Sequence, residues 1–365
     1  MTAIRVAFDV GPLHGPRTGI GSAVAAMHAA LHERDEVDVQ DFLLSFRAAS
    51  TDGTRRLPVP ASVAQRLWSR LDRPTMDRWL GDAQVVHGTN YVVPPTRRPR
   101  LVSVYDCWFL SNPELASSAV RRAGEVLRRS IAAGATVHAC SDATAEAVRA
   151  FFPRAEVITI PLGALPVPEA SPKCPIAEID GRRFIVAIGT LERRKNLPTL
   201  VRAFADVAAA DPDTLLVVAG GDGDDRVAVD RAIDQLGPQV ARRVLLTGRV
   251  DEPTRGWLLR NAAVLAYPSF DEGFGFPLLD AMQVGLPIVA SDAGSIPELT
   301  GVAALLSPPV DHAQLAANLL TALGDSAVIS QLRTAGADRW RRYSWKQCAD
   351  GLIHAYRQLD NRRRS

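Results

Sequence analysis

The sequence contains no long apolar run. None of its 365 residues belongs to an uninterrupted apolar stretch of about 18 residues, the length that a membrane-spanning helix needs. The chain passes from Met1 directly into a predicted strand, without the apolar core of a signal peptide. We therefore expect a cytoplasmic protein, and peripheral contact with the inner face of a membrane stays open.

Cysteine is scarce and scattered. Its four positions, Cys107, Cys140, Cys174 and Cys348, form no CxxC pair and no metal-ligand spacing. This pattern predicts a reducing compartment rather than a disulfide framework.

Neither sign of charge dominates. The net charge is +2 and the charged residues are spread along the chain, so nothing indicates a nucleic-acid partner. Lysine occurs only as Lys173, Lys195 and Lys346, so a lysine inside a motif is conspicuous.

The chain is long enough for two domains, and two series of strand, loop and helix predict two Rossmann-like halves. In the first half we expect strands at 4–9, 85–87, 101–105, 136–140 and 157–160. The loop from Gly11 to Gly21 follows the first strand, and Ser22 directly after it is the predicted N-cap of the next helix. Five prolines between Pro161 and Arg183 indicate an interdomain linker.

The second half has the clearer alternation. Strands are expected at 184–188, 215–219, 244–246, 264–267 and 288–290, and helices at 197–210, 226–236 and 253–261. Open parallel sheets bind ligands beyond the carboxyl ends of their strands, so the loops after these strands are expected to face one cleft.

Two carboxylates flank the start of a further predicted helix. Glu272 lies in the loop before it and Asp280 one turn inside it, with seven residues between them. Pro277 suits the first turn and Gly285 suits a left-handed C-cap. Free N–H groups and the helix dipole at such a terminus favour oxygen-rich ligands, although an acid there can also merely complement the dipole.

This spacing resembles the Glu-seven-residues-Glu signature of retaining GT-B glycosyltransferases of family 4, which transfer a sugar from a nucleotide diphosphate. The resemblance implies that Glu272 holds donor-sugar hydroxyls and that Asp280 holds the ribose. Asp280 departs from the pattern, because its side chain is one methylene shorter than glutamate. Phe274 and Gly275, inside the motif, belong to the donor-binding set that the resemblance implies.

The loop after the first strand of the second half carries three cations, Arg193, Arg194 and Lys195. Cations where a strand meets a helix can neutralise a diphosphate, although a solvated basic loop has the same composition. The segment is similar to the family's Arg-Lys-Asn loop. By resemblance, Arg194 and Lys195 stabilise the departing diphosphate and Thr190 contributes to donor binding, with Arg193 as a substitute for Arg194.

In the first half, Gly19 and Gly21 resemble the family's flexible glycine loop near donor phosphates or acceptor, although paired glycines also occur at ordinary turns. His87 ends a predicted strand, where a structural role and a substrate contact are equally expected. Ser141 is predicted to cap the next helix and is a candidate for substrate contact.

One departure concerns catalysis. Many relatives have His-Asp after the strand before the acceptor loop, whereas this chain has Tyr105 and Asp106. A phenol can donate a hydrogen bond to a sugar hydroxyl but is a poor base near neutral pH. Either Tyr105 fills a positional role, or Asp106 has taken over, or activity is low.

Two further segments match the family's loops. Asp222-Gly223-Asp224 looks like the metal-binding Asp-x-Asp of the other glycosyltransferase fold, GT-A, but it follows a strand end typical of this family, so we predict no required metal. Glu298, in the loop region after the carboxylate helix, is either a cap or a ribose contact.

The resemblance predicts an α/β protein of GT-B fold, with two Rossmann-like domains whose parallel sheets face each other across a cleft. Its expected parts are an acceptor domain at 1–165, a linker at 166–182, a nucleotide-sugar domain at 183–342, and a C-terminal helix at 343–365 that crosses back to the first domain. The expected activity is retaining transfer of mannose or a similar hexose from a nucleotide diphosphate sugar to a glycan or lipid-linked acceptor. GDP-mannose is the leading donor, with UDP- and TDP-sugars open, and no cofactor is expected. A non-catalytic partner subunit and a nucleotide-sugar 2-epimerase are the alternatives.

Residues 66–80 mix apolar and basic side chains in a way typical of a helix at an anionic lipid surface. An amphipathic core helix that breaks at Pro74 is an equally good interpretation. The side chains concerned are Leu67, Trp68, Leu71, Met76, Trp79 and Leu80 with Arg66, Arg70, Arg73 and Arg78.

Overall fold

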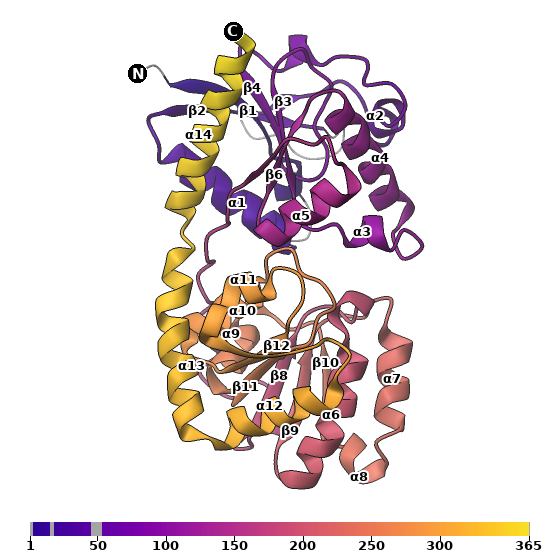
Figure 1. The fold of residues 1–365 in the computed structure, drawn as a ribbon, viewed down its shortest axis with the longest axis vertical. Helices are drawn as coiled ribbons and strands as arrows, with labels where there is room; N and C mark the ends of the chain where they lie inside the picture. Colours follow the sequence, from indigo (N-terminus) through magenta and orange to yellow (C-terminus); the bar gives the residue numbers. More distant parts are fainter. Residues whose placement is uncertain (1–2, 15–17, 45–52, 365) are drawn as a thin grey trace. The chain divides into compact units, whose positions relative to one another are not determined.

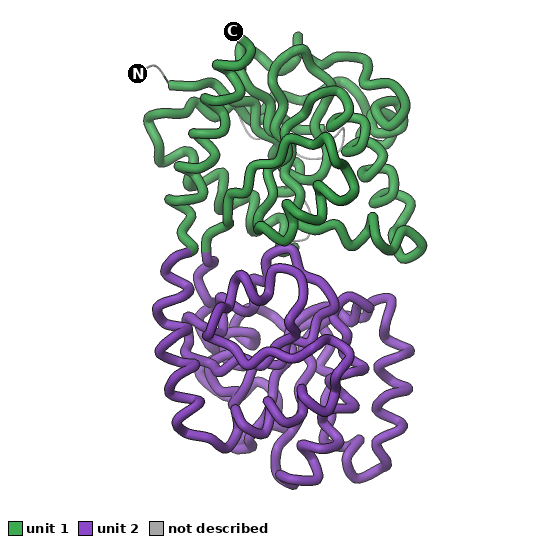
Figure 2. Tube along the Cα trace, viewed as in Figure 1, with its two compact units in different colours: residues 1–163, 343–365 green, residues 164–342 purple. Residues whose placement is uncertain are grey.

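The computed structural model describes residues 3–14, 18–44 and 53–364. The chain divides into two compact units (Figure 2). Unit 1 comprises Met1–Gly163 and Tyr343–Ser365, and unit 2 comprises Ala164–Arg342. Each unit has its own parallel sheet and its own apolar core.

Unit 1 contains a seven-stranded parallel sheet in the order β3-β2-β1-β4-β5-β6-β7. The five predicted strands are confirmed to within one residue at each end, whereas β2 and β3 were not predicted. The strands are β1 Ile4–Asp9, β2 Val37–Leu43, β3 Arg55–Arg56, β4 Val85–Gly88, β5 Arg100–Val104, β6 Thr136–Ala139 and β7 Val157–Thr159.

Helices cover the sheet of unit 1 (Figure 1). The last helix of the chain, α14, packs on α1, β1 and β4, and α2 packs on α4. The helices of this unit are α1 Gly19–His32, α2 Ala61–Trp68, α3 Trp108–Ser111, α4 Ser118–Ala132, α5 Asp142–Phe151 and α14 Trp345–Arg364.

The start of α1 differs from the prediction. Thr18, not Ser22, is the N-cap, because its Oγ1 accepts a hydrogen bond of 3.2 Å from the Gly21 amide. Gly19 and Gly21 therefore lie in the first turn of a helix rather than in a flexible loop. A Cβ at Gly21 would lie 3.0 Å from the Pro12 carbonyl oxygen, so glycine lets the preceding segment pass closely. Residues 15–17 of the predicted loop lie outside the described residues.

Residues 66–80 have both a buried and an exposed apolar set. Trp68, Met76 and Leu80 are buried in the core of unit 1, as expected for an amphipathic core segment. Leu67 and Leu71 are 40% and 64% exposed. The helix ends earlier than the expected break at Pro74, since α2 stops at Trp68 and a 3-10 turn follows at Asp77–Trp79.

Unit 2 contains a six-stranded parallel sheet in the order β10-β9-β8-β11-β12-β13. The strand order reverses between β8 and β11, and such a switch point opens a crevice at the carboxyl ends of the strands. The strands are β8 Phe184–Ile188, β9 Leu215–Ala219, β10 Val244–Gly248, β11 Val264–Tyr267, β12 Ile288–Ser291 and β13 Ala304–Ser307.

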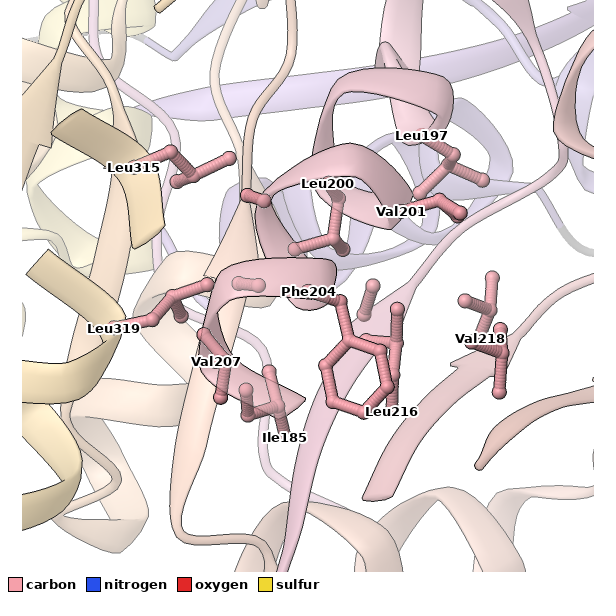
Figure 3. Packing of buried hydrophobic residues seen from close by; sticks show 14 of the residues in the cluster. Ile185, Leu197, Leu200, Val201, Phe204, Val207, Leu216, Val218, Leu315 and Leu319 are labelled. Atoms are coloured by element: carbon pink, nitrogen blue, oxygen red, sulfur yellow. The ribbon is translucent and has the colours of Figure 1, made fainter. Parts of the chain in front are cut away.

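The core of unit 2 forms where α6 and α12 cover the sheet (Figure 3). Leu200 and Phe204 of α6 pack above Ile185 and Leu216 of the sheet, and Leu319 of α12 closes the side. Helix α10 contacts β11 and β12 and lies beside α9 and α13. The helices are α6 Leu197–Ala210, α7 Arg226–Asp234, α8 Pro238–Ala241, α9 Glu252–Asn261, α10 Phe276–Val284, α11 Ile296–Thr300, α12 His312–Gly324 and α13 Ser326–Arg339.

Within the described residues, no single helix has the length and apolar character to cross a membrane. Two consecutive helical segments, His312–Gly324 and Ser326–Arg363, together have the length and composition of a membrane span, but they are bent by 93° relative to each other.

Candidate active site

The basic loop of unit 2 is a tight turn between β8 and α6. Residues Arg193–Lys195 form one 3-10 turn, and Asn196 follows in the left-handed conformation with φ of 53°. The side-chain nitrogen Nδ2 of Asn196 donates to the carbonyl oxygens of Pro268, at 2.9 Å, and Pro309, at 2.7 Å. These bonds fix the turn to the loops after β11 and β13, so the cations before Asn196 are held in place.

Glu272 is the partner of two of these cations. Its Oε1 lies 2.6 Å from Lys195 Nζ and its Oε2 lies 2.6 Å from Arg194 Nη1. Burial alone would favour the neutral acid, but Lys195 and Arg194 outweigh it and lower the pKa of Glu272 to about 2. The carboxylate is therefore ionised at any working pH and neutralises part of the charge of both cations.

Lys195 lies at the switch point of the sheet. Its Nζ donates to the Tyr267 hydroxyl at 3.0 Å, and Tyr267 is the last residue of β11. A small crevice here is lined by Gly189, Lys195, Tyr267 and Ser269, among others. Burial lowers the pKa of Lys195, although Glu272 opposes this by favouring the charged form. A buried cation at the carboxyl ends of β8 and β11 is suited to an anionic ligand.

Arg193, the third cation of the loop, is not part of the Glu272 ion pairs. Its side chain is exposed, and its backbone amide donates to Asp224 Oδ1 at 3.0 Å. Asp222 pairs with Arg226 at 2.6 Å. The two acids of the Asp-Gly-Asp segment thus anchor the basic loop and the start of α7, in keeping with their interpretation as loop residues.

The loop after β12 packs directly against Glu272. The Ser295 amide donates to the Glu272 carbonyl oxygen at 2.9 Å, and Ser295 Oγ donates to the Phe274 carbonyl oxygen at 3.1 Å. Gly294 has φ of 54°, and a Cβ there would lie 2.6 Å from both the amide nitrogen and the carbonyl oxygen of Glu272. Only glycine allows this approach, which positions the backbone of the carboxylate.

Helix α10 has the predicted ends and carries Asp280. Gly275 is its N-cap with φ of 96°, Pro277 lies in its first turn, and Gly285 is its left-handed C-cap. Asp280 is buried, and its Oδ2 accepts a hydrogen bond of 3.0 Å from Arg255 Nη1. Burial raises the pKa of Asp280 to about 7, opposed by Arg255.

Asp280 has one unsatisfied oxygen. Its Oδ1 is buried and lacks a hydrogen-bond partner among the described residues. A buried acceptor without a partner costs free energy, so this oxygen is suited to a hydroxyl group from a ligand. Sequence reasoning missed Arg255 and Tyr267; Tyr267 could have been found, because it ends a strand beside the switch point.

Thr190, Phe274 and Glu298 are the remaining predicted donor-binding residues of unit 2. Thr190 follows Gly189 in the loop after β8, and Phe274 is buried with its ring 5.3 Å from that of Phe276. Glu298 is partly buried in the first turn of α11. That helix has Ser295 at its N-cap position, so Glu298 is not the cap.

Tyr105 and Asp106 lie in unit 1, after β5. The Tyr105 hydroxyl is buried and donates to the Thr89 carbonyl oxygen at 2.8 Å. Burial raises the pKa of this phenol well above its usual value, so Tyr105 does not act as a base. Asp106 Oδ1 accepts from the Trp108 amide at 3.1 Å, and the Asp106 amide donates to the Tyr91 hydroxyl at 3.2 Å.

His87 is a structural residue in a buried chain of hydrogen bonds. The Ile160 carbonyl can only accept, so His138 donates to it from Nε2 at 2.9 Å and must accept from Ser103 Oγ at Nδ1, at 2.8 Å. Ser103 in turn accepts from His87 Nε2 at 2.8 Å, and His87 Nδ1 accepts from the Tyr356 hydroxyl at 2.7 Å. Burial lowers the pKa of both imidazoles, so both rings are neutral near pH 7, as this pattern of hydrogen bonds requires. The chain of bonds connects α14 to β4, β5 and β6.

Ser141 is the predicted cap of α5, because its Oγ accepts from the Thr144 amide at 3.0 Å. Of the predicted site residues, the structure brings Glu272, Lys195 and Arg194 into direct contact. Asp280 pairs with Arg255 instead.

Two α/β units with parallel sheets of this topology, the second with a cation–carboxylate centre at its switch point, have the GT-B fold. Sucrose-phosphate synthase from Thermosynechococcus elongatus has the same fold, with a TM-score of 0.72 and 20% identity over 98% of this chain and 99% of that one. HepE of Anabaena, in complex with UDP and glucose, has a TM-score of 0.70 and 18% identity over 97% of this chain and 100% of that one.

Sequence comparison finds one family model and related proteins. Residues 182–325 match the family model of glycosyl transferases group 1. O-antigen chain mannosyltransferase B of Escherichia coli is 28% identical over 304 residues, which cover 80% of this chain and 79% of that protein. Residues 182–325 are thus similar to the glycosyl transferases group 1 family, and this match together with the Escherichia coli relative supports a glycosyltransferase.

Proposed function

We propose that the protein is a retaining glycosyltransferase that moves a hexose, with mannose as the first candidate, from a nucleoside diphosphate to a hydroxyl of a glycan or glycolipid. The observation that carries the proposal is the placement of Glu272 between Lys195 and Arg194, at 2.6 Å from each, beside the switch point of unit 2. Mannose is supported by the name of the Escherichia coli relative.

In this proposal, Lys195 and Arg194 bind the diphosphate of the donor. As the bond between the sugar and the diphosphate breaks, its electron pair passes to the diphosphate oxygen, and the two cations stabilise that charge. The acceptor hydroxyl attacks from the same face of the sugar and its proton passes to the departing diphosphate. Glu272 binds donor-sugar hydroxyls, and since protein cations neutralise the diphosphate, the proposal includes no metal and no cofactor.

Asp280 contributes to nucleotide binding. Its buried Oδ1 has no partner among the described residues and is available to accept a hydrogen bond from a ribose hydroxyl. Arg255 holds the other oxygen and fixes the orientation of the carboxylate.

Thermal denaturation with GDP, UDP, TDP and ADP tests the donor site, because a ligand at about 100 times its dissociation constant adds about 2.7 kcal/mol of stability. We expect one nucleotide to stabilise the protein most and its sugar conjugate to support transfer. Lys195→Ala should abolish both effects, whereas Arg193→Ala, which changes an exposed neighbour in the same turn, should change neither.

Other outcomes point to the alternatives. If no nucleotide stabilises the protein, it is a non-catalytic partner subunit. Release of an altered sugar without acceptor would identify a 2-epimerase. Transfer that stops on addition of a chelator would contradict the metal-independent mechanism.

We further propose that unit 1 contacts an anionic membrane surface through the faces of α2 and α4. A groove of about 470 Å³ here is lined by Arg66, Arg70, Arg121 and Arg122, together with Ser69, Ser118 and Glu125. Exposed apolar side chains lie on the same elements: Val63 and Leu67 on α2, Leu71 just beyond it and Val120 on α4, from 40% to 64% exposed. Arginines beside exposed apolar groups are suited to lipid phosphates and the upper acyl region.

Vesicle flotation tests this contact. We expect the protein to float with vesicles that contain phosphatidylglycerol and not with phosphatidylcholine alone. The double substitution Arg66→Glu and Arg70→Glu should abolish flotation, while Arg231→Glu, at an exposed position on α7, should not. Flotation that does not depend on anionic lipid would refute the proposal.

A further inference from the structure

Two histidines and an aspartate converge in unit 1, and none of the three is among the predicted donor-site residues. His28 and His32 lie one turn apart on α1, and Asp41 lies on β2. His28 Nε2 is 2.8 Å from Asp41 Oδ1 and 3.0 Å from His32 Nε2. The three possible ligand atoms all lie within 4.8 Å of one another.

Hydrogen bonding alone does not satisfy this group well. A ring nitrogen carries either one hydrogen or one lone pair, and both lie along a single direction in the ring plane. His28 Nε2 nevertheless contacts both Asp41 and His32. If it donates to the carboxylate, it has no lone pair left to accept from His32. Two well-directed hydrogen bonds at this atom are therefore impossible, whichever tautomer is present.

A cation resolves the conflict. It can take one lone pair from each of the three atoms, and tetrahedral coordination at metal–ligand distances of about 2.0–2.2 Å separates neighbouring ligands by about 3.3 Å. The observed separations of 2.8 and 3.0 Å are close to this value. Two imidazoles and one carboxylate are ligands typical of zinc and its neighbours, and the spacing of four residues places both imidazoles on one helix face.

We propose that His28, His32 and Asp41 bind a divalent transition-metal ion of the zinc type, with water in the remaining position. His32 is exposed and the other two are partly buried, so an ion can enter from solvent. The ion connects the last turns of α1 to β2 and so stabilises unit 1. None of the three residues belongs to the proposed diphosphate-binding set, so the test of this site does not depend on the proposed activity.

Calorimetric titration of metal-stripped protein with zinc chloride tests the site. We expect one ion per chain with a micromolar dissociation constant, and a higher midpoint of thermal unfolding with zinc. His32→Ala removes an exposed ligand, and Asp41→Asn keeps the size of the side chain. Each should weaken binding at least tenfold and remove the thermal shift.

His354→Ala is the matched control. His354 lies on α14 with Gln358 one turn later, at 2.7 Å between their Nε2 atoms, but it belongs to no group of three ligands in the described part of the chain. We expect this variant to bind zinc like the unchanged protein. Equal affinity in all variants, or no micromolar binding at all, would overturn the proposal. So would a cobalt complex whose near-ultraviolet spectrum shows thiolate charge transfer, because it would place the ion on a cysteine.

Discussion

Glu272 is 6% exposed and yet ionised, because two cations contact its two oxygens separately. The carboxylate also limits what these cations can do. Lys195 and Arg194 are partly neutralised before any donor arrives, so a diphosphate must compete with Glu272 for them. This competition separates the role of the carboxylate from the role of the cations.

This competition predicts that Glu272→Gln has opposite effects on nucleotide affinity and on transfer. Glu272→Gln should leave the affinity for a nucleoside diphosphate unchanged or increase it, because both cations are released, while transfer falls by at least about 100-fold through loss of the sugar contact. Lys195→Ala should weaken nucleotide binding and transfer together. Titration calorimetry and a transfer assay on both variants check this, and weaker nucleotide binding by Glu272→Gln would show that the carboxylate contributes to diphosphate binding instead.

Tyr105 and Asp106 should behave differently from each other on substitution. The Tyr105 hydroxyl is already bonded to the Thr89 carbonyl, so Tyr105→Phe should cost about 1–2 kcal/mol of stability and keep transfer. Asp106→Ala should lose most of the transfer if this acid has replaced the family's histidine. Transfer rates and unfolding free energies of both variants are the measurements, and the reverse pattern would exclude a catalytic role for Asp106.

At this scale the sequence predicted the residue types but not their partners. Lys195 was identifiable because lysine is rare in the chain. That Arg194, and not Arg193, shares Glu272 depends on the direction of each side chain within one turn, which no periodicity specifies. Arg255 was missed because its partner Asp280 is 25 residues away, and only the packing of α9 on α10 brings them together.

At the scale of elements, two glycines in the left-handed conformation have different surroundings: Gly285 ends α10, and Gly294 lies in the loop after β12. Gly285 has φ of 70° with no atom within 4 Å of an added Cβ, whereas an added Cβ at Gly294 would meet Glu272 at 2.6 Å. Gly285→Ala should therefore cost only the backbone strain, about 1 kcal/mol, and leave transfer intact. Gly294→Ala should cost more and reduce transfer by moving Glu272. Unfolding and transfer assays on both variants check this, and equal effects would contradict it.

The connection of α14 to the sheet should depend on pH. Burial lowers the pKa of His138 to about 4, below its value of 6.5 in the unfolded chain. The unfolded state thus binds more protons between these values, so this contribution to stability is complete above about pH 6.5 and is lost as pH falls towards 4. Asp9 acts in the opposite direction, since burial raises its pKa to about 7.

Comparison with a His138 variant separates the contribution of His138 to the pH dependence of stability from that of Asp9. The destabilisation caused by His138→Gln should be about 2 kcal/mol smaller at about pH 5 than at about pH 7, because the unchanged protein loses that amount on acidification. Denaturant unfolding at both values measures it. A destabilisation that does not change with pH would mean that His138 is not neutral in the folded protein.

Elements with strong patterns were predictable, and those defined by tertiary contacts were not. Strand β8, helix α6 and strand β9 have the predicted bounds, because buried apolar runs alternate with an amphipathic helix. Strand β2 was missed because Asp38, Gln40 and Asp41 interrupt its apolar pattern. The start of α1 differs from the prediction because Gly19 and Gly21 suggest a loop, whereas the Thr18 cap begins the helix four residues earlier than the predicted Ser22 cap.

At the scale of the whole molecule, the two units have separate apolar cores. The core of unit 1 includes Leu127 of α4, and the core of unit 2 includes Leu200 of α6. Both leucines are fully buried on helices that cover a sheet, so they form a matched pair. Truncation of either to alanine should cost about 2–5 kcal/mol, but in different units.

Scanning calorimetry should therefore resolve two transitions. Leu127→Ala should lower the temperature of one and Leu200→Ala that of the other. A nucleoside diphosphate should raise only the transition that Leu200→Ala lowers, because Lys195, Arg194 and Asp280 all lie in unit 2. If both substitutions shifted one common transition equally, the units would unfold as a single cooperative body, and binding to unit 2 would then stabilise the whole chain.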